Sequence, residues 1–588
     1  MQTDGLYSRS GYEQMRLSSL FKTFLLSGIL IILSDSSSGI IPEGKIDRRL
    51  LSGNQGGDRL KVWIFFKTEE HQSVQRRPVS ERALRRMRLR GSDSNLPAKV
   101  KKIQREHIRD ISGLVERVRH ISDYFNAASA EVKRSNLVKI AELSSVNSIE
   151  PVAVFYRSAT ELSRVTYSGS CPGSQNSTRY GESLEQLDIV QATNLLEMGL
   201  NGSGQTPGGD PVRICLLDSG FDLNHEAFEH LSVIAQRDFV QGDSVTSNQS
   251  GDHPDQDRHG TLVLGAVSGY REENLVGPAW GAEYILGKTE IVGQEIIIEE
   301  DNWIAGLEWA DSAGADIVSS SLGYYEWYSN EDMDGETALT TRAAGLAAAA
   351  GILVVNAVGN QGFEGDTSLI APSDADSIIA VGSVSSSGEI AYNSSRGPSA
   401  DGRIKPEVVA MGVNVYSVDP GTYGGYARFS GTSLATPLVA GVCAQVLEAN
   451  PYLSVMELRE RILSTATRSD NPDNSYGYGI VQGLDASGLQ MPGEGGNITL
   501  AMLGRNPFSD NIRFRIYAPQ WSEISVKLYD CRGRLVKNII EYEVIKFGLV
   551  LGWDGTNRYG ERVDAGIYFL SVLRGKEMAL SRKLVLIR

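Results

Sequence analysis

Short apolar runs alternate with longer amphipathic segments between residues 181 and 487. The apolar runs lie at 212–218, 282–288, 315–323 and 352–360. Helical spacing of apolar residues follows "RHGT" (258–261), covers 302–314 and 336–351, and begins again at Ser433. Apolar strands connected by helices form parallel sheets that are covered on both faces. The pattern predicts an α/β domain whose functional groups gather at the carboxyl ends of its strands.

The region before this domain has a different pattern, over residues 58–156. We expect a strand in "LKVWIFFK" (60–67), another over 120–132, a helix over 133–143 and a last strand over 146–155. This order, β-α-β-α-β with room for one more strand, predicts a small α+β domain with an open sheet. The polar, irregular residues 157–180 then form a linker.

The last part of the chain alternates apolar and polar residues with a period of two. A Gly-rich linker over 488–496 precedes it, and the segments "ISVKLYDCRGRLVKNI" and "AGIYFLSVLRGKEMALSRKLVLIR" carry the alternation. Residues 497–588 therefore predict an all-β sandwich that folds as a linked module.

The first residues carry a candidate export signal. Arg16 and Lys22 precede a largely apolar run of ten residues from Phe24 to Leu33, and small residues follow. A bilayer-spanning helix needs about 20 apolar residues, so this run is too short for one and fits a secretory signal peptide instead. A buried helix is the alternative, but at a terminus it has little to pack against. We expect a signal peptide over 1–39, with Met15 as an alternative start, and no stable transmembrane segment after its removal.

Length and charge narrow the classes of function. The chain has 588 residues and a formal net charge of −15, which predicts roughly three to four domains and argues against nucleic acid as a partner. Residues 76–110 are an exception, with 12 Lys and Arg against 4 Asp and Glu. We interpret this basic stretch as a solvated face or as a surface docked onto the acidic remainder. The four cysteines, at 171, 215, 443 and 531, have no metal-ligand spacing and do not indicate a disulfide scaffold.

A serine in "FSGTSLATPLVAG" (429–441) is surrounded by small residues. Ser433 either begins a tightly packed helix or is a nucleophile presented at a helix N-terminus. Pro437 has no N–H to donate to the Ser433 carbonyl oxygen, which is tolerable only in the first turn.

A serine nucleophile needs a base, an orienting carboxylate and an oxyanion donor. His71, His107 and His120 belong to the N-terminal region, His225 and His230 to a polar stretch that we take as surface, and His253 to a loop. Only His259 begins an apolar helix, although a cap or surface histidine is the alternative. Asp218 ends an apolar strand, where a buried charge is costly unless it is paired with another group. A helix N-cap is the alternative role for this carboxylate. Asn360 ends another strand, and the alternative is that Gly359-Asn360 simply forms a turn.

Together these segments resemble the subtilisin family of serine proteases over roughly residues 181–487. The matching segments are "LLDSG" (216–220), "HGT" (259–261), Gly359-Asn360 and "SGTSLATP" (430–437), in the family's Asp, His, Ser order. "SSRGPSADGRIKPEVVA" (394–410) is also typical. Leu262 departs from the histidine that many members carry after "HGT", at a position that supports packing.

The resemblance implies a secreted serine endopeptidase with Asp218, His259 and Ser433 as catalytic triad and Asn360 in the oxyanion hole. It further implies polypeptide substrates bound along Ser321, Leu322, Gly323, Ala357, Val358 and Gly359. No cofactor is required; relatives often bind structural calcium, but no decisive carboxylate cluster stands out, so the metal stays open. Residues 58–156 resemble the family's inhibitory prodomain, with processing in 157–180 of an autoprocessed zymogen.

The C-terminal module resembles Ig-like domains and the sorting modules of type IX secretion, which implies contact with export or cell-surface machinery. A catalytically silent binding protein on the same scaffold is the rival hypothesis, but a binding module does not need all four polar residues. An α/β-hydrolase is excluded because that fold orders its triad Ser, Asp, His.

Overall fold

A computed structural model of the chain describes twelve ranges of residues. These are 44–51, 58–67, 79–91, 105–157, 177–204, 209–292, 296–325, 327–490, 498–502, 506–518, 522–545 and 548–587. The predicted signal peptide, Cys171 and most of the predicted processing linker lie outside them.

The N-terminal domain is a four-stranded antiparallel sheet with order β2-β3-β1-β4. Its elements are α1 (Arg48–Leu51), β1 (Arg59–Phe66), α2 (Glu81–Arg90), α4 (Arg105–Ser112), β2 (Arg117–Ser122), β3 (Ala127–Lys133), η1 (Arg134–Asn136), α5 (Leu137–Glu142) and β4 (Val146–Pro151). The strand expected over 120–132 is a hairpin, because residues 123–126 turn and Asn126 has a φ of 50°, which Asn tolerates better than most residues.

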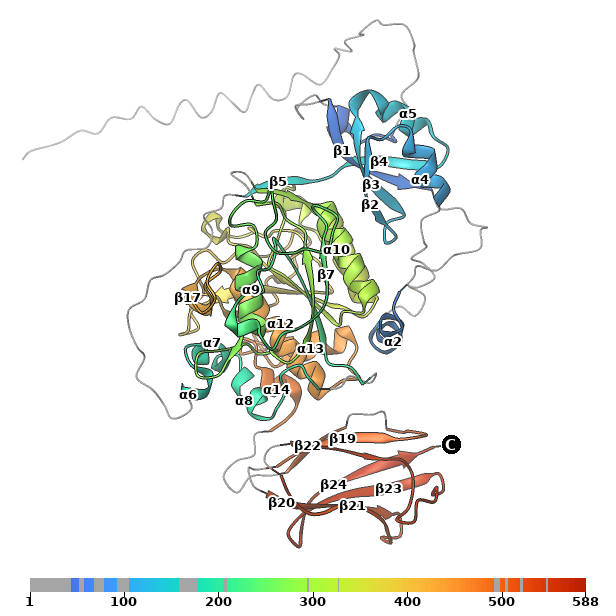
Figure 1. Cartoon of the computed structure of the whole chain (residues 1–588), viewed down its shortest axis with the longest axis vertical. Helices are drawn as coiled ribbons and strands as arrows, with labels where there is room; N and C mark the ends of the chain where they lie inside the picture. The colour runs from blue at the N-terminus through green and yellow to red at the C-terminus, as the bar shows by residue number, and fades with distance from the viewer. Residues whose placement is uncertain are drawn as a thin grey trace, which may run out of the picture. The chain divides into compact units, whose positions relative to one another are not determined.

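The central domain is built on a seven-stranded, all-parallel sheet, which confirms the predicted α/β class (Figure 1). The sheet order is β15-β14-β13-β12-β6-β10-β7. The strands are β6 (Arg213–Asp218), β7 (Ser232–Asp238), β10 (Glu283–Lys288), β12 (Ile317–Ser320), β13 (Leu353–Ala357), β14 (Ile379–Val384) and β15 (Val408–Met411). Sequence patterns predicted β6, β10, β12 and β13 but not the other three.

Helices cover both faces of this sheet. Residues of α9 (Arg258–Ser268) and α12 (Thr432–Ala449) share a core with Ile214 and Leu216 of β6, whereas α10 (Glu300–Ala313) and α11 (Leu339–Ala349) pack with Cys215 and Leu217, which point to the other face. All 18 residues of α12 are buried. By length and composition α12 is the one helix in the described residues that could cross a membrane, and here it is the core helix of the central domain.

Shorter elements complete the central domain. They are β5 (Val154–Arg157), α6 (Ser177–Tyr180), α7 (Leu184–Asp188), α8 (Ala192–Glu197), η2 (Glu226–Phe228), β8 (Tyr270–Arg271), β9 (Leu275–Val276), β11 (Ile296–Glu299), η3 (Asn330–Asp332), η4 (Gly362–Glu364), β16 (Val415–Val418), β17 (Tyr426–Phe429), α13 (Val455–Ser464) and α14 (Gly483–Ser487). Strand β5, directly after the N-terminal domain, pairs antiparallel with β11.

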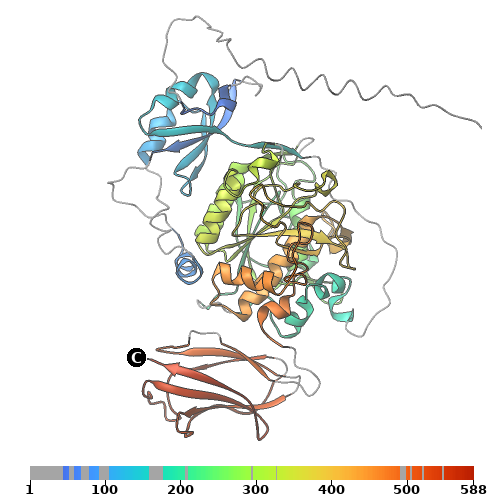
Figure 2. The ribbon, with the colours of Figure 1, turned by 180° about the vertical axis from the view of Figure 1, so that it is seen from behind.

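The C-terminal domain consists of two antiparallel sheets that share one core, as the period-two pattern predicted (Figure 2). The sheet orders are β18-β19-β22 and β21-β20-β23-β24. The strands are β18 (Thr499–Met502), β19 (Ile512–Tyr517), β20 (Ser522–Asp530), β21 (Leu535–Ile545), β22 (Gly548–Trp553), β23 (Gly566–Arg574) and β24 (Glu577–Leu586). Arg515 of β19 forms an ion pair with Glu448, near the C-terminus of α12, with Nη1 and Oε1 3.1 Å apart.

Candidate active site

Three neighbouring strands of the central sheet end at the predicted site. Asp218 is the last residue of β6, Ser321 follows the end of β12, and Asn360 lies three residues after the end of β13. The strands are adjacent in the order β13-β12-β6, so their carboxyl ends meet at one edge of the sheet. Ligands and reacting groups gather at this edge in α/β folds.

Asp218 and His259 form a hydrogen-bonded pair at this edge. His259 Nδ1 lies 2.7 Å from Asp218 Oδ1, and the Ser219 N–H donates to the same oxygen. A carboxylate only accepts hydrogen bonds, so the pair places the proton on Nδ1 and leaves Nε2 as the acceptor nitrogen. His259 Nε2 is buried and has no hydrogen-bond partner among the described residues. The pair therefore presents a free basic nitrogen.

Glycine at position 260 allows α9 to begin against the end of β6. A Cβ at Gly260 would lie 2.1 Å from the Gly220 carbonyl oxygen and 3.0 Å from the Asp218 Cβ. The absence of a side chain thus brings the first turn of α9, and His259 with it, next to Asp218. Leu262, one turn on, packs in a small core with Phe429 and Leu434, in keeping with the packing role expected for it.

Ser433 lies in the first turn of α12, where the partial positive charge of the helix N-terminus favours negative charge. Its hydroxyl is 3.4 Å from the Ser321 carbonyl oxygen, a long contact that leaves the Oγ free to rotate. Gly431, the N-cap residue, has a φ of 154°, which glycine adopts most readily.

The Ser433 carbonyl oxygen is satisfied from outside the helix. Pro437 has no N–H to offer it, and the Ser321 hydroxyl donates to it instead, with an O···O distance of 2.9 Å. The sequence predicted Ser321 as a substrate-binding residue and missed this contact. The proline four residues after Ser433 was the signal, because a freed buried carbonyl needs another donor.

Asn360 is fixed by its side-chain oxygen. Oδ1 accepts from the Thr432 N–H at 3.0 Å and from the Thr432 hydroxyl at 3.1 Å. The amide nitrogen is left to donate, and it would lie 3.7 Å from a Cβ at Gly431. A donor held at the N-terminus of α12, beside the turn that carries Ser433, is suited to bind an oxyanion.

The other residues predicted to contact substrate lie along the same two strand ends. Leu322, Ala357 and Val358 have buried side chains in the core, and Gly323 packs so closely against Ile370 that a Cβ would lie 2.2 Å from Ile370 Cδ1. Gly359 accepts from the Thr432 hydroxyl through its carbonyl oxygen. Their contact with a peptide stays a prediction, and only backbone atoms of the three buried residues could take part.

His225 is not the surface residue that the polar sequence around it suggested. It is 3% exposed, its Nδ1 accepts from the Ala227 N–H, and its Nε2 lies 2.8 Å from the Gly425 carbonyl oxygen. His230 packs edge-on against Tyr270 and Trp280. Both histidines have structural contacts away from Ser433, which leaves His259 as the histidine of the site.

All four carboxylates of α10 contact the N-terminal domain, and Glu308 and Glu300 each accept one of its backbone N–H groups. Glu308 accepts from the Ser122 hydroxyl and from the Asp123 N–H, the latter at 3.0 Å. Glu300 accepts from the Ala153 N–H at 3.1 Å and from the Tyr328 hydroxyl at 2.8 Å. Burial raises the pKa of Glu300 to about 7. In the described residues no group of three or more His, Cys, Asp or Glu side chains could hold a metal ion.

Comparison with known proteins gives consistent matches. The model of the subtilase family (peptidase S8) matches residues 209–479. Subtilisin DY from Bacillus licheniformis is 34% identical over 302 residues, which are 51% of this chain and 94% of that protein. Subtilisin E from Bacillus subtilis (strain 168) is 34% identical over 362 residues, 61% of this chain and 80% of that protein. M-protease from Shouchella clausii (strain KSM-K16) is 32% identical over 296 residues, which are 50% of this chain and 67% of that protein.

Proposed function

This chain belongs to the subtilase family of serine endopeptidases, and we propose that it is a secreted member that is made as an autoprocessed zymogen. The observation that carries the proposal is the 2.7 Å contact between Asp218 Oδ1 and His259 Nδ1, at the sheet edge where Ser433 lies in the first turn of α12. Asp218, His259 and Ser433 are the proposed triad, with Asn360 as oxyanion donor.

In this mechanism, His259 Nε2 takes the proton of the Ser433 hydroxyl as the oxygen attacks a peptide carbonyl carbon. Asp218 holds the imidazole in the required tautomer and stabilises its charged form. The Asn360 amide and the Ser433 N–H bind the oxyanion. His259 then gives the proton to the leaving amine, the C–N bond breaks, and water hydrolyses the acyl-enzyme by the same route in reverse.

Autoprocessing is proposed from the segment that joins the first two domains. Strand β5 runs antiparallel to β11, with backbone pairing from Val154–Glu299 to Arg157–Ile296. A peptide substrate can add to a sheet edge as an extended strand in this way. The N-terminal domain would thus act first as an intramolecular substrate, cleaved within 157–180, and then as an inhibitor.

Export is proposed from the apolar run Phe24–Leu33 and its basic flank. The C-terminal domain is proposed to direct export or to hold the enzyme at the cell exterior. Polypeptides are the substrates; no cofactor takes part in the chemistry, and structural calcium stays an open proposal.

The test compares the wild-type chain with Ser433→Ala, using Ser383→Ala as control. Ser383 is another buried serine, and its hydroxyl has no partner within the described residues. We expect Ser433→Ala to lose casein hydrolysis and labelling by a serine-directed reagent, and to keep its N-terminal domain covalently attached. Unchanged hydrolysis in Ser433→Ala contradicts the triad. Normal cleavage of that variant, made without other proteases, contradicts autoprocessing. Sequencing the mature N-terminus from the culture medium tests export.

A further inference from the structure

Helix α2 of the N-terminal domain buries three arginines on one face. Arg82, Arg86 and Arg90 are four residues apart and are 8%, 2% and 3% exposed, whereas Arg88 of the same helix is exposed. Residues at this spacing lie one above the other along a helix. Arginine is almost never fully buried unless it is paired, so this face is built to meet a partner surface.

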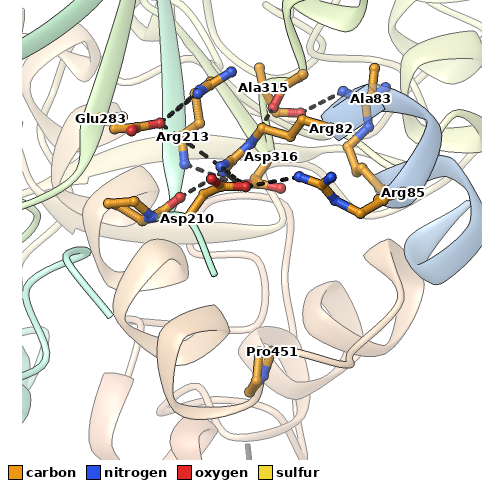
Figure 3. A network of polar contacts seen from close by, with 12 residues as sticks. Arg82, Ala83, Arg85, Asp210, Arg213, Glu283, Ala315, Asp316 and Pro451 are labelled. Carbon is orange, nitrogen blue, oxygen red and sulfur yellow. Dashed lines mark hydrogen bonds and ion pairs between the residues drawn. The ribbon is translucent and has the colours of Figure 1, made fainter. Parts of the chain in front are cut away.

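The partner of Arg82 and Arg90 is a single carboxylate at the start of β12. Arg82 Nη2 donates to Asp316 Oδ2 at 2.6 Å, and Arg90 Nη1 donates to Asp316 Oδ1. Arg82 also donates to the Gly314 carbonyl oxygen from Nε and lies 3.2 Å from Asp210. Figure 3 shows Arg82 and Arg85 reaching from α2 toward Asp210 and Asp316, with Arg213 and Glu283 beside them.

Arg86 binds where two helices of the central domain end. Its guanidinium donates to the Asp311 carboxylate of α10, to the Ala315 carbonyl oxygen at 2.7 Å and to the Ala350 carbonyl oxygen at 3.3 Å. Asp311 also accepts from the Tyr124 hydroxyl of the N-terminal domain. Carbonyl groups at helix C-termini lack helical donors and favour cations, so this site suits a guanidinium.

The backbone of α2 fits the same surface closely. A Cβ at Gly351, after α11, would lie 3.0 Å from the Gly91 nitrogen and 3.2 Å from the Arg86 carbonyl oxygen. A Cβ at Gly314, after α10, would lie 3.0 Å from Arg82 Cγ. The Ser80 N–H also donates to the Ser312 carbonyl oxygen at 3.0 Å. Contact at this distance requires that both glycines have no side chain.

This surface is at the opposite end of the sheet from the catalytic residues. Asp210 and Asp316 precede β6 and β12, and Glu283 begins β10, whereas Asp218 ends β6 and Ser321 follows β12. Six residues of extended strand span about 20 Å. An α2 bound here cannot obstruct Ser433 directly.

We propose that the catalytic domain has a second prodomain-binding surface, the arginine socket, formed by Asp210, Glu283, Asp311, Asp316 and the carbonyl groups of Gly314, Ala315 and Ala350. Its partner is a helix with arginines at positions i, i+4 and i+8, which is α2 of the same chain. The socket keeps the N-terminal domain bound after the linker is cut and makes that domain a bivalent inhibitor. This inference rests on the proposed function, because it assumes cleavage within 157–180.

A domain that binds through two surfaces at once has a higher overall affinity, because binding of the first surface raises the effective concentration of the second. The gain over one surface alone is about 10²–10⁴-fold. The first test measures how fast the cleaved N-terminal domain leaves the processed full-length protein, by gel filtration and by the appearance of peptidase activity. We expect Arg82→Gln, Arg86→Gln and Arg90→Gln each to speed release by about 30-fold or more, since each removes a buried, charged hydrogen bond to Asp316 or Asp311. Arg88→Gln, on the exposed face, is the matched control and should release at the wild-type rate.

A second test needs no variant and so does not depend on variant folding. The wild-type protein is treated with phenylglyoxal before and after cleavage, and arginine modification is read by mass spectrometry. We expect Arg82, Arg86 and Arg90 to stay protected after cleavage while Arg88 reacts. Equal reaction of all four in the cleaved protein overturns the socket.

The two proposals fail in different ways. A wild-type chain that shows neither cleavage nor peptidase activity contradicts the proposed function. A chain that is cleaved and inhibited, but whose three arginine variants release the N-terminal domain as slowly as Arg88→Gln, contradicts the arginine socket alone.

Discussion

The Ser321 hydroxyl donates a 2.9 Å hydrogen bond to the Ser433 carbonyl oxygen, in the place of the N–H that Pro437 lacks. The bond joins the end of β12 to the first turn of α12. The proline in α12 and the serine after β12 therefore act as a pair. Pro437 frees the carbonyl, and Ser321 both satisfies it and holds the turn that carries Ser433.

Ser321→Ala is expected to destabilise the protein by about 1–3 kcal/mol, because it leaves a buried carbonyl without a donor. We also expect kcat to fall with little change in KM, since the turn that positions Ser433 loses a support. Thermal unfolding and steady-state kinetics measure the two effects. Ser319→Ala is the control: this buried β12 hydroxyl has no partner among the described residues, and its removal should change neither quantity. Equal behaviour of the two variants would falsify the role given to Ser321.

Asn360→Ala is expected to lower kcat by about 10²–10³-fold with little change in KM. This magnitude is the one known for the oxyanion-hole asparagine of subtilisin itself, a relative of this chain. Asn360→Asp separates two roles, because it keeps an oxygen for the Thr432 N–H but has no amide to donate. If the donor matters, the Asp variant is as slow as the Ala variant; wild-type activity in either one argues against the oxyanion role.

The cleaved N-terminal domain is expected to leave faster as the pH rises from 5 to 8. Burial raises the pKa of Glu300 to about 7 in the complex, from an ordinary value of 4.5 to which it returns once the carboxyl is exposed. The complex therefore favours the protonated carboxyl, and this contribution, full below pH 4.5, is lost as the pH rises to 7. The change in affinity is on the order of 10–10²-fold.

Gel filtration of the processed protein at the two pH values measures this effect. Glu300→Gln keeps the hydrogen-bonding shape but cannot ionise, so its release rate should not follow the same pH dependence. Tyr328 and Ala153 contact the Glu300 carboxyl directly, and Asp301 lies beside it in α10. A wild-type rate that is equal at pH 5 and 8 rules out this contribution.

Arg515→Met is expected to lower stability by about 3–5 kcal/mol, because removal of one member of a buried ion pair leaves the other unpaired. Glu448 is buried, and among the described residues the Asn201 and Gly202 N–H groups remain to bind it. Burial already raises the pKa of Glu448, so the loss of stability should grow as the pH rises and the carboxyl ionises.

Arg513→Met, two residues earlier on β19, is the matched control for thermal unfolding. Truncation after Gly496 removes Arg515 as well and should lower the thermal midpoint in the same direction. A truncated protein with an unchanged midpoint would mean that the C-terminal domain is linked but contributes nothing to the stability of α12.

The sequence was sufficient to locate the ends of strands, and the candidate site residues there, where a polar residue follows a run of apolar ones. Asp218 follows a run of apolar residues, and Gly359-Asn360 ends a run of the same kind, so strand ends and candidate chemistry coincided. His259 stood out because an apolar helix follows it. The structure brings Asp218 and His259 together as the pattern predicted, whereas the roles of the site residues remain predictions.

The missed strands have weaker patterns for physical reasons. Strand β7 is at a sheet edge and alternates between exposed and partly buried residues, so it contains polar side chains. Strand β15, at the other edge, has only four residues. Strand β14 is interior but contains Gly382, where a Cβ would lie 3.0 Å from Pro406 and from Val409. The polar residues of β7, the short length of β15 and the glycine in β14 each weaken the pattern that marks a strand.

The basic stretch 76–110 allows two interpretations, either as a solvated face or as a surface docked onto the rest of the chain. The contacts of α2 support docking for one face of this helix and exposure to solvent for the other. The net charge of the stretch could not separate them. The spacing of Arg82, Arg86 and Arg90 was the available signal, because four-residue steps put charges on one helical face. Which carboxylates they meet depends on tertiary contacts between residues more than 200 positions apart.

The shared carboxylate of Asp316 has a consequence for how this protein can change over evolutionary time. Two arginines of α2 and the Arg213 N–H bind it, so substitution of Asp316 alone removes the carboxylate that pairs with Arg90 and one of those that pair with Arg82. Substitution of the arginines alone leaves the Asp316 carboxylate buried without a cation. Helix α2 and the segment that contains Asp311 and Asp316 should therefore vary together among relatives. In a subtilase without the three arginines of α2, selection for acids at the positions of Asp311 and Asp316 should be lost.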